Sequence, residues 1–209
     1  MKLVLFGASG RTGRHLLQQA LAQGHDVTAF VRNPGSLLPV DRLIIQQGDV
    51  LNRADVERAV QNQDAVVSAL GGGRIAPSSG PHVSVRTFGT EHILAAMEHT
   101  GVRWFICESA YGVGENKNRS LYALVAWRLN RTGFEDTDRQ EHLIKRSGLD
   151  WIIVRPTRLT DGPKRGVYRA GVGLRVGPFA YISRADVADF MLKQVTATTY
   201  LRQTPVLLY

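Results

Sequence analysis

Short apolar segments alternate with helical patterns along most of the chain, and this alternation is the strongest constraint on its fold. The segments predicted to be strands are 2–6, 26–31, 42–47, 64–70, 103–109 and 150–156. Apolar runs of this length are typical of strands buried on both faces, which requires helices on each side of a parallel sheet. Right-handed crossovers then predict an α/β fold with a doubly wound, mostly parallel sheet, whose functional crevice lies at the carboxyl ends of the strands.

Helical periodicity fills the intervals between these segments, and the pattern loosens after residue 156. The predicted helices are 12–23, 52–60, 83–100, 134–147 and 184–196, with a shorter one near 120–130. The looser part contains extended pieces near 166–170 and 174–177 and a closing strand at 205–209. A length of 209 residues fits one domain. We expect a single domain over 1–209, in which about 156–209 completes a substrate pocket.

The net charge of +8 is concentrated in the second half of the chain. Residues 101–209 carry seventeen Lys and Arg against ten Asp and Glu, whereas residues 1–100 carry nine against eight. Nucleic-acid binding is one explanation for such a charge, through neutralisation of phosphates. The basic residues are dispersed and no nucleic-acid-binding module is present. The charge therefore favours a solvated basic face together with arginines around an anionic small molecule.

Cysteine and histidine usage narrows the class of protein further. The single cysteine, Cys107, excludes an intramolecular disulfide framework, and the six histidines have no metal-binding spacing, so no metal is expected. No signal peptide is visible, and no apolar run approaches the roughly 20 residues of a membrane span. We therefore expect a cytoplasmic protein, a monomer or a homodimer, with no membrane partner.

Three glycines follow the first predicted strand, in the stretch Gly7-Ala8-Ser9-Gly10-Arg11-Thr12-Gly13. In a dinucleotide-binding loop the first glycine permits a tight turn, the second admits a pyrophosphate, and the third lets helix and strand pack closely. The next helix directs free N–H groups and its positive dipole end at the phosphates. A merely tight strand-to-helix turn is the alternative. Because the loop joins a predicted strand to a predicted helix, we interpret it as a cofactor-phosphate site.

The residue after the second strand discriminates between cofactors. An NAD site places a carboxylate about 20 residues beyond the loop, where it bonds the ribose 2′-hydroxyl. Here "TAFVRNP" has Arg32 at that place and no carboxylate. A guanidinium is a bidentate partner for a 2′-phosphate, and Arg11 in the loop is a second candidate for the same group. We predict NADP(H) over NAD(H), with a surface role for Arg32 as the alternative.

Two further loops lie at the same edge of the predicted sheet. Asp49 and Val50 follow the third strand, where aspartate can accept a hydrogen bond from the adenine amino group and valine can pack on the ring. A loop or capping role for Asp49 is nearly as plausible. After the fourth strand come Leu70, Gly71 and Gly72, which allow the chain to pass close to pyrophosphate and ribose, with Arg74 nearby.

The ends of the fifth and sixth strands are predicted to hold the reacting groups. Ser109 lies where a nicotinamide ring is expected, so its hydroxyl is a candidate partner for the carboxamide or a substrate carbonyl, and Tyr111 is two residues on. Pro156 and Thr157 are expected to border the nicotinamide, and Arg158 to face an anionic substrate.

Two features near these ends keep alternatives open. Arg155 and Arg158 are equally explained by salt bridges to local acids such as Asp161. The segment 113–134, with Trp127 and several basic residues, is interpreted as a lid over the substrate, a surface element or a subunit contact.

Together these features resemble the atypical short-chain dehydrogenase/reductases over essentially the whole chain. The resemblance rests on "GASGRTG", "VRNP", "GDVLNRADVERAVQNQDAVVSALG", "SGLDWIIVRPTRLTD" and "ISRADVADFML", and is strongest to the flavin reductase/biliverdin-IXβ reductase branch and its NmrA-like neighbours. It implies a Rossmann fold and an active-site serine at Ser109. The NADPH-binding residues that it implies are Gly7, Ser9, Gly10, Arg11, Thr12, Gly13, Arg32, Asp49, Val50, Leu70 and Gly71.

Two departures from the family pattern bear on the chemistry. The Tyr-x-x-x-Lys pair is missing, since Tyr122 is followed four residues later by Ala126, and Tyr111 by Glu115. Arg158 replaces the histidine of the biliverdin-reducing branch, which argues against tetrapyrrole reduction. Ketone reduction needs a positioned proton donor, whereas hydride transfer to a flavin or quinone needs mainly proximity and orientation.

The resulting prediction is an NADPH-dependent reductase of a small planar acceptor such as a flavin or a quinone, in which a flavin would be a substrate rather than a bound prosthetic group. One alternative is an NmrA-like sensor that binds NADP(H), turns over little and signals through a protein partner. Reduction or isomerisation of a sugar nucleotide or another small carbonyl is a third possibility, against which the missing lysine argues.

Overall fold

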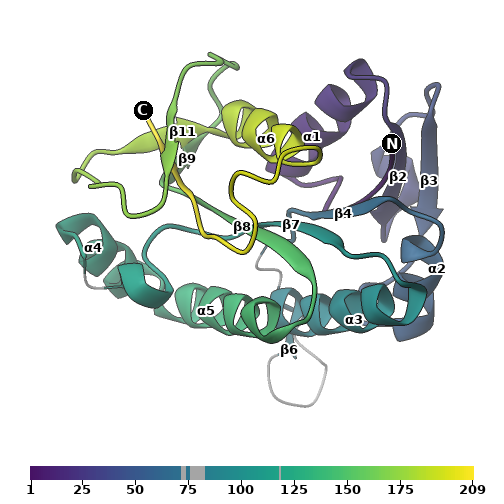
Figure 1. Cartoon of the computed structure of the whole chain (residues 1–209), viewed down its shortest axis with the longest axis horizontal. Helices are drawn as coiled ribbons and strands as arrows, with labels where there is room; N and C mark the ends of the chain where they lie inside the picture. Colours follow the sequence, from purple (N-terminus) through teal and green to yellow (C-terminus); the bar gives the residue numbers. More distant parts are fainter. Residues whose placement is uncertain (72–73, 76–82, 118) are drawn as a thin grey trace.

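A computed structural model describes residues 1–71, 74–75, 83–117 and 119–209 of the chain (Figure 1). Its centre is an eight-stranded sheet with the order β10-β12-β8-β7-β4-β1-β2-β3. The strands of this sheet are β1 (Lys2–Phe6), β2 (Asp26–Val31), β3 (Leu43–Gln47), β4 (Ala65–Ser68), β7 (Trp104–Glu108), β8 (Asp150–Pro156), β10 (Arg169–Gly171) and β12 (Val206–Leu208). Every neighbouring pair is parallel except β10 with β12.

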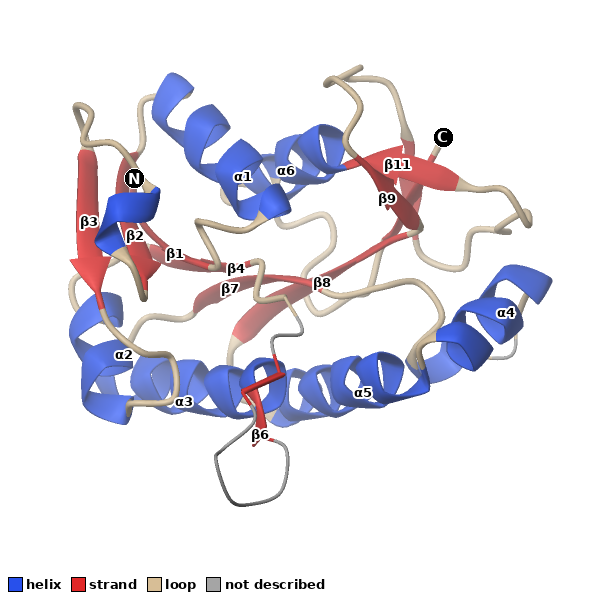
Figure 2. Ribbon diagram, turned by 180° about the vertical axis from the view of Figure 1, so that it is seen from behind, coloured by secondary structure: helices blue, strands red, loops and turns tan. Residues whose placement is uncertain are grey.

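Helices cover both faces of this sheet, as Figure 2 shows from behind. The helices are α1 (Arg11–Ala22), α2 (Arg53–Val60), α3 (Val85–Thr100), α4 (Leu121–Leu129), α5 (Arg131–Arg146) and α6 (Arg184–Lys193). Helices α1 and α6 lie on one face and bury Leu16 and Met191 against it, while α2, α3 and α5 lie on the other. Alternation along β1 divides its side chains between these two cores, with Leu5 on the first face and Phe6 on the second. The doubly wound α/β prediction is therefore confirmed.

The order of the strands places the crevice where the sequence predicted it. Strand β1 pairs with β2 on one side and with β4 on the other, so the chain reverses its winding direction at β1. Such a switch point opens a crevice at the carboxyl ends of the strands, where helices on opposite faces diverge. The glycine loop leaves β1 at this point.

Local capping explains where several helices begin. Asn52 accepts hydrogen bonds from the N–H groups of Ala54 and Asp55 at the start of α2, and Ser183 accepts from Asp186 at the start of α6. Asparagine and serine are among the residues preferred at this position, so both helix starts have a local sequence signal. None of the helices in the described ranges is long and apolar enough to cross a membrane.

The region after β8 differs most from the sequence prediction. The extended piece expected near 174–177 forms no strand, because those residues are irregular chain between two turns. Instead β9 (Arg158–Thr160) pairs in parallel with β11 (Tyr181–Ser183) in a small separate sheet. Strands of three residues are too short to give a two-residue alternation, so the sequence could not reveal this pairing.

The remaining short elements lie in loops. They are the single-turn helices η1 (Pro34–Ser36) and η2 (Gly114–Asn116) and the antiparallel pair β5 (Arg74–Ile75) and β6 (Val83–Ser84). Strand β6 occupies the first two residues of the predicted helix 83–100, so that helix begins at Val85.

Candidate functional site

The glycine loop is packed so tightly against its surroundings that side chains are excluded at two of its glycines. Gly7 has φ of +84°, and a Cβ on it would lie 2.4 Å from the carbonyl oxygen of Ala69 at the end of β4. A Cβ on Gly13, in the first turn of α1, would lie 2.0 Å from the carbonyl oxygen of Gly7. The loop therefore lies directly against strand and helix, as a backbone cradle for a phosphate requires.

The beginning of α1 leaves its N–H groups available to a ligand. The helix starts after Gly10, which offers no side chain to cap it, and no acidic residue occupies the first turn. The N–H of Gly10 is bonded to the carbonyl of Gly7 at 2.9 Å, which closes the turn. Uncapped N–H groups and the positive end of a twelve-residue helix are suited to an anion. The residues present therefore fit the pyrophosphate of a dinucleotide.

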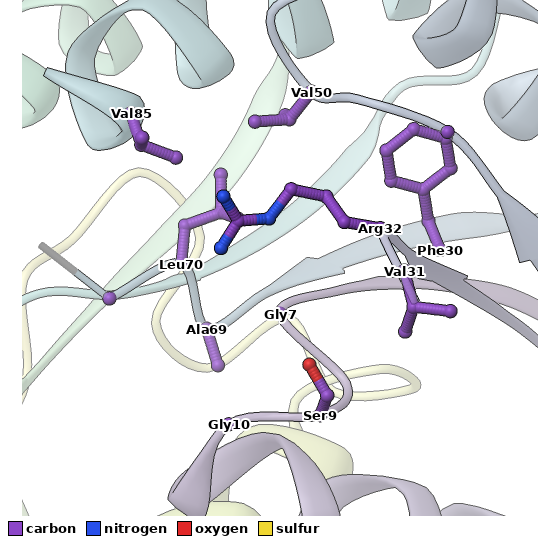
Figure 3. Close-up of a pocket in the computed structure, with 12 residues that line it drawn as sticks. Gly7, Ser9, Gly10, Phe30, Val31, Arg32, Val50, Ala69, Leu70 and Val85 are labelled. Carbon is purple, nitrogen blue, oxygen red and sulfur yellow. The ribbon is translucent and has the colours of Figure 1, made fainter. Parts of the chain in front are cut away.

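A pocket of about 290 Å³ opens beside this loop, between the ends of β1, β2 and β4 (Figure 3). Seven residues predicted for the cofactor line it: Gly7, Ser9, Gly10, Arg32, Val50, Leu70 and Gly71. The sequence analysis missed five others, Phe30, Val31, Gly48, Ala69 and Val85. They are strand-end apolar side chains, a glycine and the first residue of α3, which no local pattern distinguishes from ordinary core.

Arg32 and Val50 line the pocket, whereas Asp49 is hydrogen-bonded within its own loop. Figure 3 shows the exposed Arg32 side chain extending across the pocket in the direction of Leu70, with Val50 to one side of it. Asp49 Oδ1 accepts a hydrogen bond from the N–H of Leu51 at 3.0 Å, which is the loop role considered as an alternative. An adenine contact for Asp49 stays a prediction.

Thr12 links the first turn of α1 to an acid that the sequence analysis did not single out. Its hydroxyl donates to Glu108 Oε1 at 3.0 Å, at the carboxyl end of β7 and one residue before Ser109. Desolvation raises the pKa of Glu108 to about 7, although Thr12 and the positive charges of Arg86 and Arg184 oppose the shift. A titrating carboxyl group thus lies at the glycine-loop side of the strand end. The sequence signal for this residue is the charged Glu108 near the end of the otherwise apolar run "RWFICES".

Arg11 contacts the C-terminal part of the chain instead of lying over the glycine loop. Its guanidinium donates to Asp161 Oδ2 at 3.2 Å, and Arg184 donates to Asp161 Oδ1 at 2.6 Å. Arg11 and Asp161 are 72% and 61% exposed, so this pair contributes little to stability. The contact nevertheless joins the glycine loop to the segment that follows β9.

Ser109 is buried, and its hydroxyl hydrogen is donated to another side chain within the protein. It donates to Glu141 Oε1, on α5, at 2.6 Å. Arg155, which is fully buried, donates to the same carboxylate from Nε at 2.8 Å and from Nη2 at 2.5 Å. The serine is therefore held in one orientation by an ionised pair on the α5 side of the sheet.

A second acid completes the surroundings of Arg155. Nη1 of Arg155 donates to Glu115 at 2.5 Å, and Thr204 and Lys145 contact the same carboxylate at 3.1 and 3.6 Å. Partial burial opposes ionisation of Glu115, but the hydrogen bonds from Arg155 outweigh it and lower its pKa to about 2. The salt-bridging alternative for Arg155 is therefore confirmed, but its partners are Glu115 and Glu141 and not Asp161. The Arg155 side chain faces α5, whereas Asp161 lies beside Arg184 at the start of α6.

Tyr111 and Arg158 differ sharply in exposure. Tyr111 is 2% exposed and packs against Tyr122 of α4 with ring centroids 5.8 Å apart. Arg158 is exposed, and its guanidinium lies 5.7 Å from the centroid of the Tyr181 ring. Arg158 forms no ion pair within the part of the chain that is described, so its charge is available to a ligand.

The last predicted cofactor residues have structural contacts of their own. The carbonyl of Pro156 accepts the N–H of Tyr111 at 2.9 Å, and the Thr157 hydroxyl donates to the carbonyl of Leu207 at 3.2 Å. These bonds attach the end of β8 to the loop after β7 and to β12. Gly72 lies outside the described residues.

Comparison with protein families identifies the chain. Residues 7–198 match the family described as NAD(P)H-binding. The chain is 28% identical over 203 residues to the protein YwnB of Bacillus subtilis, covering 93% of this chain and 92% of YwnB. It is 23% identical to the photosystem II assembly factor Ycf39 of Synechocystis, covering 98% of this chain but only 61% of that longer protein.

Solved structures share the fold at low sequence identity. The anaerobilin reductase ChuY of Escherichia coli O157:H7 superimposes with a TM-score of 0.83 at 22% identity, covering 99% of this chain and 96% of ChuY. A short-chain dehydrogenase/reductase of Veillonella parvula gives 0.82 at 19% identity, with coverages of 99% and 93%. The chain belongs to the NAD(P)H-binding family and has the Rossmann fold of the atypical short-chain dehydrogenase/reductases.

Proposed function

We propose that the protein is an NADPH-dependent reductase that delivers hydride to a small planar acceptor, a flavin or a quinone. The observation that carries this proposal is the hydrogen bond from Ser109 to Glu141 at 2.6 Å. With its hydrogen engaged, the Ser109 oxygen can accept a hydrogen bond from a ligand N–H but has no proton to give to a carbonyl. Acceptors that collect their proton from water suit such a site.

The preference for NADPH is supported by the charges around the pocket. Arg32 is exposed, extends into the pocket and has no carboxylate beside it at the end of β2 (Figure 3). A guanidinium there offers paired N–H donors to a 2′-phosphate, whereas a 2′-hydroxyl gains nothing from its charge. Arg11 would have to leave Asp161 to assist, so we assign the 2′-phosphate to Arg32 alone.

The residues of this chain would hold and orient the reactants in distinct ways. Bound NADPH would supply the hydride. The N–H groups at the start of α1 would neutralise the diphosphate, and Ser109 would orient the carboxamide by accepting its N–H. Arg158, exposed at the start of β9, would attract an anionic acceptor such as a flavin phosphate.

Reductases occur among the relatives, together with hydroxysteroid dehydrogenases and an epimerase. ChuY is described as an anaerobilin reductase, and a Streptomyces protein 30% identical over 116 residues as a 3-diazoavenalumate denitrifying reductase. Ycf39 is described as an assembly factor, which keeps a protein-binding sensor as the contrasting hypothesis.

An acceptor panel tests the proposal. The purified protein would be mixed with NADPH and, in separate reactions, FMN, menadione or dichlorophenolindophenol, and loss of the nicotinamide absorbance followed. We expect oxidation well above the protein-free rate with at least one acceptor. Ser109→Ala should slow that reaction at saturating NADPH. Tight NADPH binding without oxidation by any acceptor would reject the reductase and favour the sensor.

A further inference from the structure

Helix α4 exposes an apolar stripe that nothing in the described chain covers. Leu121, Leu124, Val125 and Leu129 are 65%, 51%, 49% and 82% exposed, and their spacing places them along one side of the helix. The opposite side holds Ala123, which is buried. Single exposed leucines are ordinary, but four aliphatic side chains on one nine-residue helix indicate a contact surface.

A neighbouring loop extends this apolar surface. Ala123 shares a small core with Val176, and Leu174 packs against the same core, so the loop leading into β11 lies beside α4. Figures 1 and 2 place both segments at the same end of the molecule. Phe179 and Val172 in this loop are 85% and 55% exposed. We call α4 and residues 172–180 together the α4 end.

The α4 end is also strongly basic. Residues 117–131, which include α4, contain four Lys and Arg and no Asp or Glu, and residues 172–180 contain Arg175 and no acid. Arg131 is paired with Glu135. Lys117, Arg119, Arg128 and Arg175 are exposed and form no ion pair with the described acids.

We propose that the α4 end docks on the surface of an anionic lipid bilayer. Exposed aliphatic side chains bordered by cations are the combination that binds the interface of such a membrane, with the apolar groups inserted and the cations near the headgroups. A second copy of the chain is a poorer occupant, because a symmetric contact would set these cations against one another. Nucleic acid would use the cations but would leave the leucines in water.

Docking on a membrane surface needs no membrane-spanning segment. The sequence argument against a membrane partner rested only on the absence of such a segment. The proposal is also independent of the reductase activity, because the surface lies outside the pocket beside the glycine loop. Binding can therefore be measured without cofactor or acceptor, and either proposal can fail alone.

Vesicle flotation tests the docking surface. The full-length protein would be floated with vesicles of phosphatidylcholine, with or without phosphatidylglycerol, at low and high salt. At about 1 kcal/mol per cation near the headgroups, we expect at least about tenfold more protein on the anionic vesicles, and less at high salt. The double variant Leu124→Glu/Leu129→Glu should abolish flotation. Leu38→Glu is the control, since Leu38 is as exposed as Leu129, at 82%, and lies elsewhere.

Each contrary result is decisive. No flotation with anionic vesicles, equal flotation with both lipids, or binding that the double variant retains would overturn the proposal. Tighter binding to a DNA duplex than to the vesicles would replace the membrane by a nucleic acid. Thermal unfolding of both variants near the wild-type temperature would show that lost flotation is not lost folding.

Discussion

The buried ion pair between Arg155 and Glu141 gives the sharpest prediction about stability. The substitution Glu141→Gln keeps the shape of the side chain and an oxygen for Ser109 but removes the charge that faces Arg155, a side chain with 0% exposure. Breaking a buried pair by removing one partner costs about 3–5 kcal/mol, because the remaining charge is left uncompensated. Arg155 keeps Glu115, whose side chain is 46% exposed, so we expect the lower end, about 3 kcal/mol.

Thermal unfolding and activity together test this reasoning. For a chain of this size, about 3 kcal/mol corresponds to a Tm lower by about 6–12 °C. The control is Glu135→Gln, because the Arg131–Glu135 pair is largely exposed, with Arg131 at 79%, and contributes little to stability. If Glu141→Gln lowered the Tm no more than Glu135→Gln, the buried pair would not be the stabilising element described here.

Further predictions concern the glycine loop and the acid beside it. Gly13→Ala should abolish NADPH binding and destabilise the fold by roughly 1–3 kcal/mol, because its Cβ would meet the Gly7 carbonyl at 2.0 Å. Gly148→Ala, after the end of α5 and outside the pocket, has a Cβ that would meet nothing within 4 Å, so it should leave both unfolding and NADPH titration unchanged. The folded-state pKa of Glu108 lies at about 7, above its ordinary 4.5, so the folded state binds that proton more tightly. Stability should therefore fall as pH rises from about 4.5 through about 7, by about 1–2 kcal/mol for this partly exposed group. Denaturant unfolding against pH should show that decline in the wild type and lose it in Glu108→Gln; an identical decline in the variant would assign it to another group.

The sheet and the glycine loop were predictable because each depends on neighbouring residues in the sequence. Apolar runs mark the buried strands, and Asn52 and Ser183 mark helix starts through short-range hydrogen bonds. Gly7 and Gly10 precede α1 and Gly13 lies in its first turn, and the geometry allows no side chain at Gly7 or Gly13. Such signals require no knowledge of distant contacts.

The partners of the site residues could not be predicted in the same way. Ser109 is bonded to a residue 32 positions away, and Thr12 to one 96 positions away. Those contacts depend on which face of β7 each residue occupies and on which helix covers that face. Glu108 faces α1 and Ser109 faces α5, so neighbouring residues join different networks. The small β9–β11 sheet was missed for the same reason, since its pairing is nonlocal.

The comparison of NADPH and NADH affinities is the most direct test of the cofactor site. Dissociation constants for both would be measured by titration of the wild type and of Arg32→Glu. Loss of a charge-assisted contact to the 2′-phosphate is worth about 1.5–3 kcal/mol, so the variant should bind NADPH about 10- to 100-fold more weakly and NADH almost unchanged. Equal losses for the two cofactors, or no preference for NADPH in the wild type, would contradict the account.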